Sequence, residues 1–137
     1  MAVELQKDSI DLGIVIKDSA AALAFYRDVL GFDHEGDIPM PGNSSGTMHR
    51  LRCGTTLVKL VKLDQDPPVD APPGGIPGGT GFRYFTMHVS NLAEITGQCR
   101  AAGATVIIDC AEIRPGVSIT MVTDPDGNWV EFVSDQN

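Results

Sequence analysis

The spacing of apolar side chains predicts a strand and then a helix near the start of the chain. Residues 11–16 are mostly apolar and β-branched and read as a strand. The next apolar side chains repeat at the i, i+3, i+4, i+7 spacing of one helix face: Ala22, Phe25, Tyr26 and Val29. Asp18 or Ser19 stands where a helix needs an N-cap, and Gly31 stands where a glycine ends a helix in the left-handed conformation.

A polar stretch and two apolar runs complete the first half. Residues 37–46 are rich in turn-forming side chains and are predicted to be a connection. The runs at 47–52 and 55–63 predict a hairpin that turns around Gly54. Residues 64–81 contain five prolines and five glycines, which predicts a linker because this composition resists both helix and central strand.

The same order of elements recurs after the linker. Residues 82–89 predict a strand, Asn91 and Glu94 have the spacing of a capping box, and Gly103 marks the end of a helix. The Asp-Pro-Asp-Gly sequence at 124–127 suits a type I turn. The remaining strands are predicted from β-rich runs at 105–108, 117–123 and 128–134.

An offset of 72 to 73 residues lays one half of the chain on the other. It pairs Asp11 with Tyr84, Ile16 with Val89, Gly31 with Gly103, and Lys59 with Glu131. This constancy indicates two copies of a βαβββ unit, at about 9–63 and 82–134. A single unit leaves one apolar sheet face uncovered, so we expect the two to fold as one domain, 1–137, around a shared small-molecule cleft.

Composition narrows the class of protein. A chain of 137 residues with a net charge of −8 suits one domain and repels nucleic-acid phosphates, so no nucleic-acid partner is expected. Three cysteines without CxxC spacing predict reduced thiols rather than a disulfide framework or a zinc site. No run of about 18 apolar residues occurs, so neither export nor a membrane partner is predicted, and we expect a cytoplasmic protein.

Two segments resemble a known family. The sequence GIVIKD at 13–18, leading to FYRDVLGF at 25–32, resembles the opening of the vicinal oxygen chelate superfamily. The sequence DPDGNWVEF at 124–132 resembles the last turn and strand of glyoxalase I, fosfomycin-resistance and bleomycin-resistance proteins. The resemblance implies an α+β fold in which two tandem βαβββ modules form a curved, partly open mixed β-sheet barrel around a cleft, with the helices outside. It also implies a homodimer.

Metal-dependent members of that superfamily place ligands on the first and last strands of each module. The resemblance maps these positions onto Asp11, Lys59, Tyr84 and Glu131. A protonated ammonium has no lone pair and a neutral phenol is a poor ligand, so two donors remain where three or four are wanted. We therefore expect no metal and no other cofactor. The alternative is a divalent metal to which His49 supplies a third donor.

Glu131 is the predicted proton-transfer base. Because side chains alternate along a strand, Glu131 shares a face with Trp129 and Val133, and the resemblance implies that this face lines the pocket. A plain surface charge is the alternative. Lys59 interrupts an apolar run at the equivalent position of the first module. An ion pair between Lys59 and Glu131 would lower the pKa of the Glu131 carboxylate. The sequence leaves a structural and a catalytic role for such a pair as alternatives.

Tyr84 and His49 are the further catalytic candidates. The Tyr84 hydroxyl is predicted to hold a substrate oxygen, with an ordinary strand aromatic as the alternative. Counting back three residues from Arg52, and from the matching Asp124, pairs His49 with Met121. An imidazole with a reference pKa near 6.5 shuttles protons at neutral pH. A structural histidine is the alternative, and we assign no role to His34. The residues predicted to contact substrate are Asp11, Lys59, Met121 and Trp129.

Two functions are compatible with these residues. The first is a glyoxalase-like enzyme, of isomerase, epimerase or lyase type, that acts by proton transfer on a small oxygenated metabolite in a metal-free pocket. The second is a non-catalytic protein that binds or sequesters a small molecule, as bleomycin-resistance proteins do. The variety of ionisable groups favours the enzyme, and the missing metal ligands weigh against it.

Overall fold

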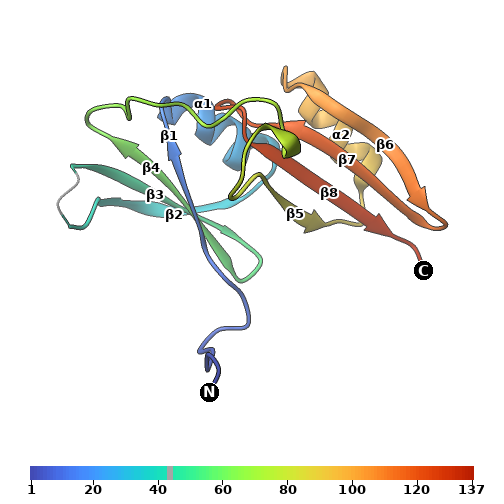
Figure 1. Cartoon of the computed structure of the whole chain (residues 1–137), viewed down its shortest axis with the longest axis horizontal. Helices are drawn as coiled ribbons and strands as arrows, with labels where there is room; N and C mark the ends of the chain where they lie inside the picture. The colour runs from blue at the N-terminus through green and yellow to red at the C-terminus, as the bar shows by residue number, and fades with distance from the viewer. Residues whose placement is uncertain (43–44) are drawn as a thin grey trace. The chain divides into compact units, whose positions relative to one another are not determined.

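The computed structural model describes residues 1–42 and 45–137 of the chain. These residues form two compact units, Met1–Pro68 and Val69–Asn137. The boundary between the units along the chain falls within the predicted linker. Each unit holds one βαβββ module with a mixed four-stranded sheet (Figure 1). The predicted α+β fold of two tandem modules is therefore confirmed. In the described residues, none of the helices is long and apolar enough to span a membrane.

The first unit contains a sheet whose first strand is parallel to its last. Strand β1 pairs in parallel with β4, and the hairpin β3–β4 and the edge strand β2 add antiparallel pairs. The strand order is β1 (Leu12–Ile16), β4 (Thr56–Leu63), β3 (Gly46–Cys53) and β2 (Asp33–Pro39). Helix α1 (Ser19–Leu23) continues as a π-helical segment, Ala24–Val29.

Local sequence accounts for where this first helix begins and ends. The Asp18 carboxylate accepts a hydrogen bond from the Ala21 backbone N–H at 3.1 Å, which confirms it as the N-cap. Gly31 has a φ of 79°, as predicted for the residue that ends the helix. Phe25 and Tyr26, on the predicted apolar face, are buried in the core.

The second unit repeats this arrangement. The strand order is β5 (Tyr84–His88), β8 (Trp129–Asp135), β7 (Val117–Thr123) and β6 (Val106–Arg114). Helix α2 (Leu92–Ala101) packs on β6, β7 and β8, and a 3₁₀ turn, Ile76–Gly78, lies in the linker. The Asn91 side chain makes no capping hydrogen bond, whereas the Gly127 N–H donates to the Asp124 carbonyl at 3.0 Å as the predicted turn requires.

Two strands depart from the sequence prediction. The polar stretch 37–46 was predicted as a connection, but its first residues belong to β2; residues 43–44 of that stretch lie outside the described residues. Strand β2 has almost no apolar alternation because it lies at the sheet edge, where most of its side chains stay exposed. Strand β6 also runs further than the predicted 105–108, through bulges that interrupt its pairing with β7.

The register of each sheet separates a helix-facing side from an open face, by which we mean the face opposite the helix of the same module. Helix-facing side chains of the central strands are almost fully buried. They include Leu51, Val58 and Leu60 in the first unit and Val122, Val130 and Phe132 in the second. The residues between them along each strand point to the open face. The predicted site residues divide between these two sides.

Candidate functional site

Glu131 lies on the open face of the second unit. Its strand neighbours Val130 and Phe132 are buried beneath the helix, so the Glu131 side chain points to the opposite side, where it is half-buried. The parallel register places Thr86 of β5 beside it, and the Thr86 hydroxyl donates a hydrogen bond to Glu131 Oε1 at 2.6 Å. In the described residues, this is the bond that orients the carboxylate.

The register brings three other predicted residues to the same face. Tyr84 is paired with Trp129, and Met121 is paired with Glu131 across the antiparallel β7–β8 ladder. Tyr84 is 47% exposed and Met121 only 2% exposed. The side chains of Glu131, Tyr84, Trp129 and Met121 therefore lie on one sheet face.

Thr86 was not among the predicted site residues. The signal that would have found it is the strand period, since Thr86 lies two residues after Tyr84 and therefore shares its face. A threonine on an exposed edge strand carries no other mark of function.

The linker packs on this face at Trp129. A Cβ added to Gly75, whose φ is 65°, would overlap the six-membered ring of Trp129. Arg83 holds the linker in place, because its guanidinium donates to the Gly75 carbonyl and, at 2.9 Å, to the Pro72 carbonyl. The predicted connection is therefore also a cover for the only tryptophan of the chain.

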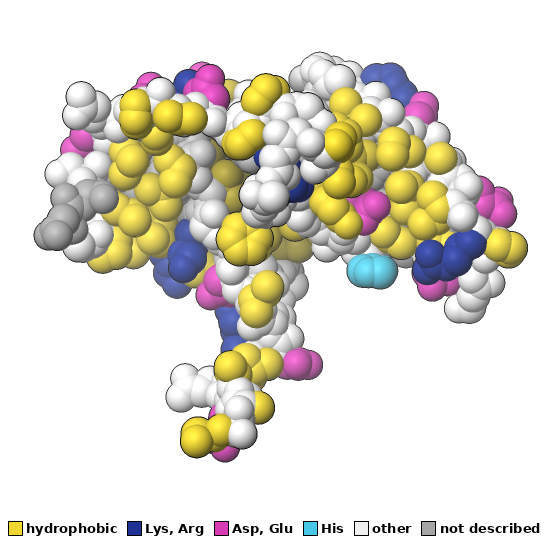
Figure 2. Space-filling view, viewed as in Figure 1, with side chains coloured by type: hydrophobic (Ala, Val, Ile, Leu, Met, Phe, Trp, Pro, Cys, Tyr) yellow, Lys and Arg dark blue, Asp and Glu magenta, His cyan; other side chains and the backbone are white. Residues whose placement is uncertain are grey.

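A groove of about 580 Å³ lies at the other end of the same strand pair. His88 and Val133, which line it, are the next residues after Thr86 and Glu131 on the open face. Its other lining residues are Val89, Ser90, Ser134, Asp135 and Gln136. Figure 2 shows hydrophobic side chains gathered over β7 and β8 with acidic groups among them. The Glu131 carboxylate thus lies between Tyr84 and Trp129 on one side and the groove on the other.

The first unit has different chemistry at the equivalent positions. Lys59 is paired with Gly13 as Glu131 is paired with Thr86, so the predicted equivalence of Lys59 and Glu131 agrees with the register. Arg50 lies opposite Lys59 on the neighbouring strand. The open face of the first unit is therefore cationic where that of the second unit is acidic.

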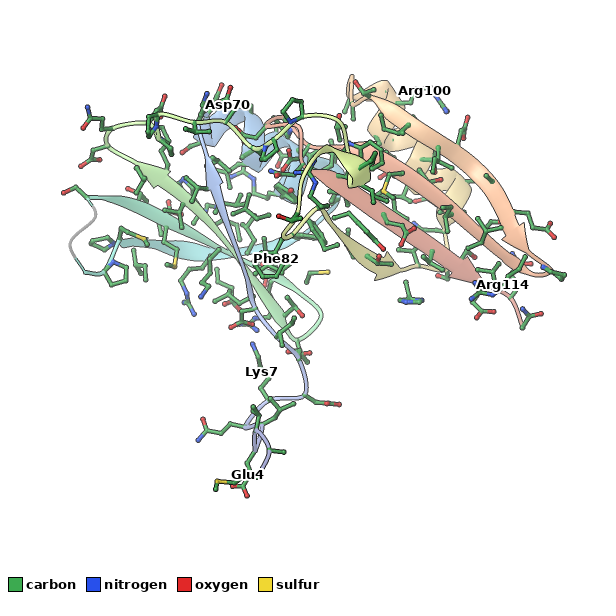
Figure 3. The ribbon with its side chains drawn as sticks, viewed as in Figure 1. Glu4, Lys7, Asp70, Phe82, Arg100 and Arg114 are labelled. Atoms are coloured by element: carbon green, nitrogen blue, oxygen red, sulfur yellow. The ribbon has the colours of Figure 1, made fainter. Side chains whose placement is uncertain are left out.

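Asp11, the equivalent of Tyr84, is fully engaged by its own unit. Its Oδ1 accepts from Lys7 Nζ at 2.5 Å and from the Leu57 backbone N–H at 2.9 Å (Figure 3 labels Lys7). The hydrogen bond from Lys7, followed by that from Leu57, lowers the pKa of the Asp11 carboxyl below its usual 3.8. These bonds suit an anchor for the N-terminal segment.

The four positions that the family resemblance assigns to a metal do not fit one. The protonated Lys59 ammonium has no lone pair, and the neutral phenol of Tyr84 is a poor ligand. The Oδ1 atom of Asp11 already accepts two hydrogen bonds. Asp11 and Glu131 are left as the two good donors, fewer than the three or four protein ligands that such an ion takes.

The sequence equivalence of His49 and Met121 is wrong by one residue. Four residues separate Arg52 from its strand partner Leu57, whereas five separate Thr123 from its partner Trp129. The longer second turn shifts the alignment of the preceding strand by one position. Because the strand period is two, such a shift moves a side chain to the other sheet face.

His49 therefore lies on the helix-facing side, where it is the equivalent of Thr120 rather than of Met121. It is buried, with 7% of its surface exposed. Its Nε2 lies 2.9 Å from Ser19 Oγ of α1, and its Nδ1 lies 2.8 Å from Asp37 Oδ1 of β2. His49 is thus not among the residues that share a face with Lys59 and Asp11.

Comparison with known proteins assigns the fold to a family. The model of the Glyoxalase/Bleomycin resistance protein/Dioxygenase superfamily matches residues 9–132. A glyoxalase family protein from Bacillus cereus is 12% identical with a TM-score of 0.83, over 98% of this chain and 97% of that one. A glyoxalase I mutant from Zea mays is 20% identical with a TM-score of 0.71, over 90% of this chain and 43% of that one. No curated protein sequence matched.

Proposed function

The chain belongs to the glyoxalase/bleomycin resistance protein/dioxygenase superfamily, and from this membership we propose that it is an enzyme that moves a proton on a small oxygenated metabolite. The observation that supports the proposal is the Glu131 carboxylate. It is half-buried on a sheet face beside a groove, and one oxygen is oriented by Thr86 at 2.6 Å. The other oxygen is left to accept a proton.

The proposed step is an isomerisation through an enolate. Glu131 Oε2 takes the proton from a hydroxyl-bearing carbon next to a carbonyl. The electron pair of that C–H bond forms the carbon–carbon double bond of an enediolate, and the π pair of the carbonyl moves to its oxygen. The Tyr84 hydroxyl donates a hydrogen bond to that oxygen as its charge grows. Glu131 then returns the proton to the former carbonyl carbon, and the proton of the substrate hydroxyl passes to the former carbonyl oxygen. The hydroxyl-bearing carbon thereby becomes the new carbonyl, so no oxidant or other reactant is consumed.

The rest of the face would bind the substrate without reacting. The indole of Trp129, backed by the linker at Gly75, offers an apolar wall. The groove at His88 and Val133 has room for a polar extension of the substrate. A metabolite with one apolar and one oxygenated end suits this arrangement.

The test begins with a panel of substrates. Thiol adducts of 2-oxoaldehydes, acyl thioesters and vicinal diols would be incubated in deuterated water, and carbon-bound deuterium followed by NMR. For a compound that exchanges, Glu131→Gln should lower turnover by about 10² to 10⁴, the usual worth of an acid–base group, while affinity stays within severalfold. Glu112→Gln, an exposed acid on β6, is the control and should retain full activity.

Exposed aromatic side chains favour binding without chemistry as a second candidate. Phe82, labelled in Figure 3, is fully exposed just before β5, and Tyr84 is 47% exposed on it. With Trp129 they suit an amphipathic aromatic ligand. In this case no compound of the panel exchanges deuterium, and drug-like compounds bind equally well to the wild type and to Glu131→Gln. That pair of results would reject the enzyme.

A further inference from the structure

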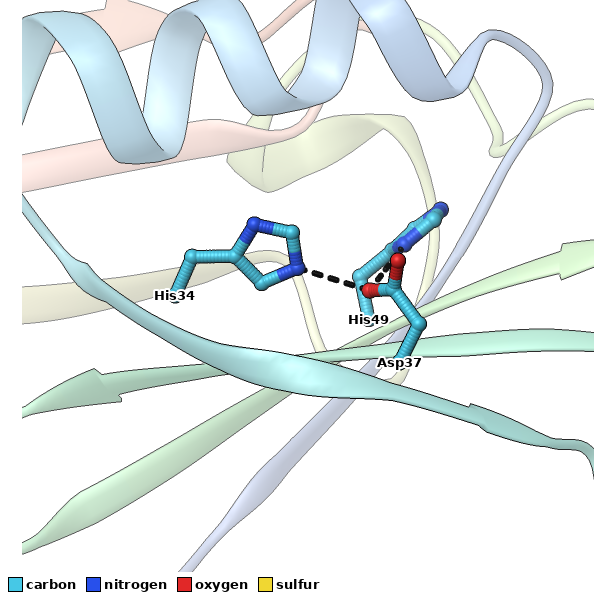
Figure 4. A group of neighbouring side chains, drawn as sticks. All are labelled: His34, Asp37 and His49. Atoms are coloured by element: carbon cyan, nitrogen blue, oxygen red, sulfur yellow. Dashed lines mark hydrogen bonds and ion pairs between the residues drawn. The ribbon is translucent and has the colours of Figure 1, made fainter.

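We propose that the first unit contains a binding site for a divalent transition-metal ion, formed by His34, Asp37 and His49 (Figure 4). The site lies on the helix-facing side of the first sheet. It is therefore separate from the open-face positions discussed above and goes beyond the proposed function.

The three side chains converge on one point. Both His34 Nε2 and His49 Nδ1 lie within hydrogen-bond distance of the same oxygen, Asp37 Oδ1, at 2.7 Å and 2.8 Å. One ligand atom from each residue lies within 4.8 Å of the others. A tetrahedral ion with bonds of about 2 Å needs ligand atoms about 3.3 Å apart, so a small rotation of the imidazole rings completes the site.

A bulge in the edge strand creates this convergence. His34 and Asp37 are three residues apart, and in a regular strand they would point to opposite faces. His34 pairs with Leu51 of β3, and Gly36 pairs with Arg50, the next residue of β3. One step along β3 therefore corresponds to two steps along β2. The extra residue brings Asp37 to the face of His34. Bulges often re-aim a side chain in this way next to functional sites.

The donor set selects the class of metal. Two imidazoles and one carboxylate suit Zn²⁺, Co²⁺ or Ni²⁺ rather than the oxygen-seeking Mg²⁺ or Ca²⁺. Three protein ligands leave one position for water. With His49 bound through Nδ1, its Nε2–H donates to Ser19 Oγ at 2.9 Å, which is the outer-shell partner that a metal-bound histidine requires.

Arg27 opposes metal binding and gives the proposal a distinctive test. Its Nη1 lies 3.5 Å from His34 Nδ1, so it favours the tautomer whose proton is on Nε2, the atom that faces the metal. Arg27 is also paired with Asp28 at 2.8 Å. Replacing Arg27 should free the other tautomer and remove a nearby positive charge. Arg27→Met should therefore bind the metal severalfold more tightly.

The experiment is a titration of the full chain with Co²⁺, followed by its visible d–d absorption and by calorimetry. The wild type should bind one Co²⁺ per chain, and Zn²⁺ should displace it. His34→Gln and Asp37→Asn should each weaken binding by about 10-fold or more, since each removes a ligand. Gly36→Ala should weaken it too without removing a ligand, because Gly36 has a φ of 152° in the bulge.

The controls decide between this site and others. His88→Gln changes the remaining histidine of the chain and should leave Co²⁺ affinity unchanged. Circular dichroism of each variant shows whether it is folded, and His34 and Asp37, being partly exposed, are preferred over the buried His49 for this reason. The proposal is overturned if the wild type binds no stoichiometric Co²⁺, if His34→Gln and Asp37→Asn bind it as the wild type does, or if binding is lost in Glu131→Gln instead.

Discussion

The two modules use the same positions for different chemistry. On the open faces, Lys59 opposite Arg50 in the first unit corresponds to Glu131 opposite Met121 in the second. The backbone pairing at these positions is the same in both units. What differs is side-chain charge, so a duplicated scaffold has kept its geometry while its two copies have acquired opposite electrostatic character.

The helix-facing sides show the same principle in the core. His49 and Thr120 occupy equivalent places, and each contacts a hydroxyl on its own helix, Ser19 at 2.9 Å and Thr96 at 2.7 Å. In each unit the adjacent edge strand carries a bulge. The bulge of the second unit contains Cys110, whose φ of 47° is unusual for a residue other than glycine. The bulge thus brings a histidine and a carboxylate, His34 and Asp37, together beside His49 in one copy, and a thiol beside Thr120 in the other.

The linker's packing on Trp129 is a feature of the second unit that a single substitution can remove. Gly75→Ala places a Cβ against the indole at a φ of 65°, so we expect a loss of about 2–4 kcal/mol in the free energy of unfolding or detachment of the linker. Because Trp129 is the only tryptophan, detachment would appear as red-shifted emission with stronger iodide quenching.

Gly79→Ala is the matched control within the same linker. Gly79 has an extended φ of 177°, and an added Cβ would make ordinary contact with Pro72 at 3.4 Å. Its fluorescence and stability should match those of the wild type. Equal behaviour of the two variants would contradict the assigned packing of the linker on Trp129.

The buried hydroxyl pair distinguishes the second core from the first. Thr96 donates to the Leu92 carbonyl at 2.7 Å, so Thr120 donates to Thr96 and accepts from the Cys110 N–H at 3.1 Å. Thr120→Val leaves that N–H without its partner and should cost about 1–3 kcal/mol in urea unfolding.

Thr123→Val on the same strand provides the comparison. Its side chain is on the open face and only partly buried, so the same substitution should change stability by less than about 0.5 kcal/mol. If both variants unfold at the same urea concentration, the Thr96–Thr120 contact contributes nothing to stability.

Much of the fold could be predicted because its signals are local. The Asp18 cap, the glycines at 31 and 103, and the Asp124 turn each depend on a few neighbouring residues. The correspondence of Lys59 with Glu131 could also be predicted, because the offset between the final strands is constant. These features needed no knowledge of long-range contacts.

The candidate metal site could not be predicted, for two physical reasons. Its strand, β2, has polar side chains and no alternation, so it was predicted as a connection. The bulge that unites His34 and Asp37 is visible only once the pairing with β3 is known. His49 was recognised as a candidate but placed on the wrong face, since a single extra turn residue reverses the orientation of a strand side chain.

The smallest expected effect concerns the first strands, where Asp11 in one module corresponds to Tyr84 in the other. The pKa of Asp11 is lowered chiefly by its hydrogen bond from Lys7. A carboxyl whose folded pKa is depressed stabilises the protein above its unfolded pKa, here 3.8, and this contribution is lost as the pH falls through the lower folded value. Asp11→Asn should therefore lower stability at pH 7 slightly and flatten the loss of stability in acid, as followed by urea unfolding between pH 7 and pH 2. Asp8→Asn, in the same exposed segment, serves as the control and should leave the acid dependence as in the wild type. An Asp11→Asn curve parallel to that of the wild type throughout this range would mean that neither the Lys7 nor the Leu57 hydrogen bond depresses the pKa of Asp11 in solution.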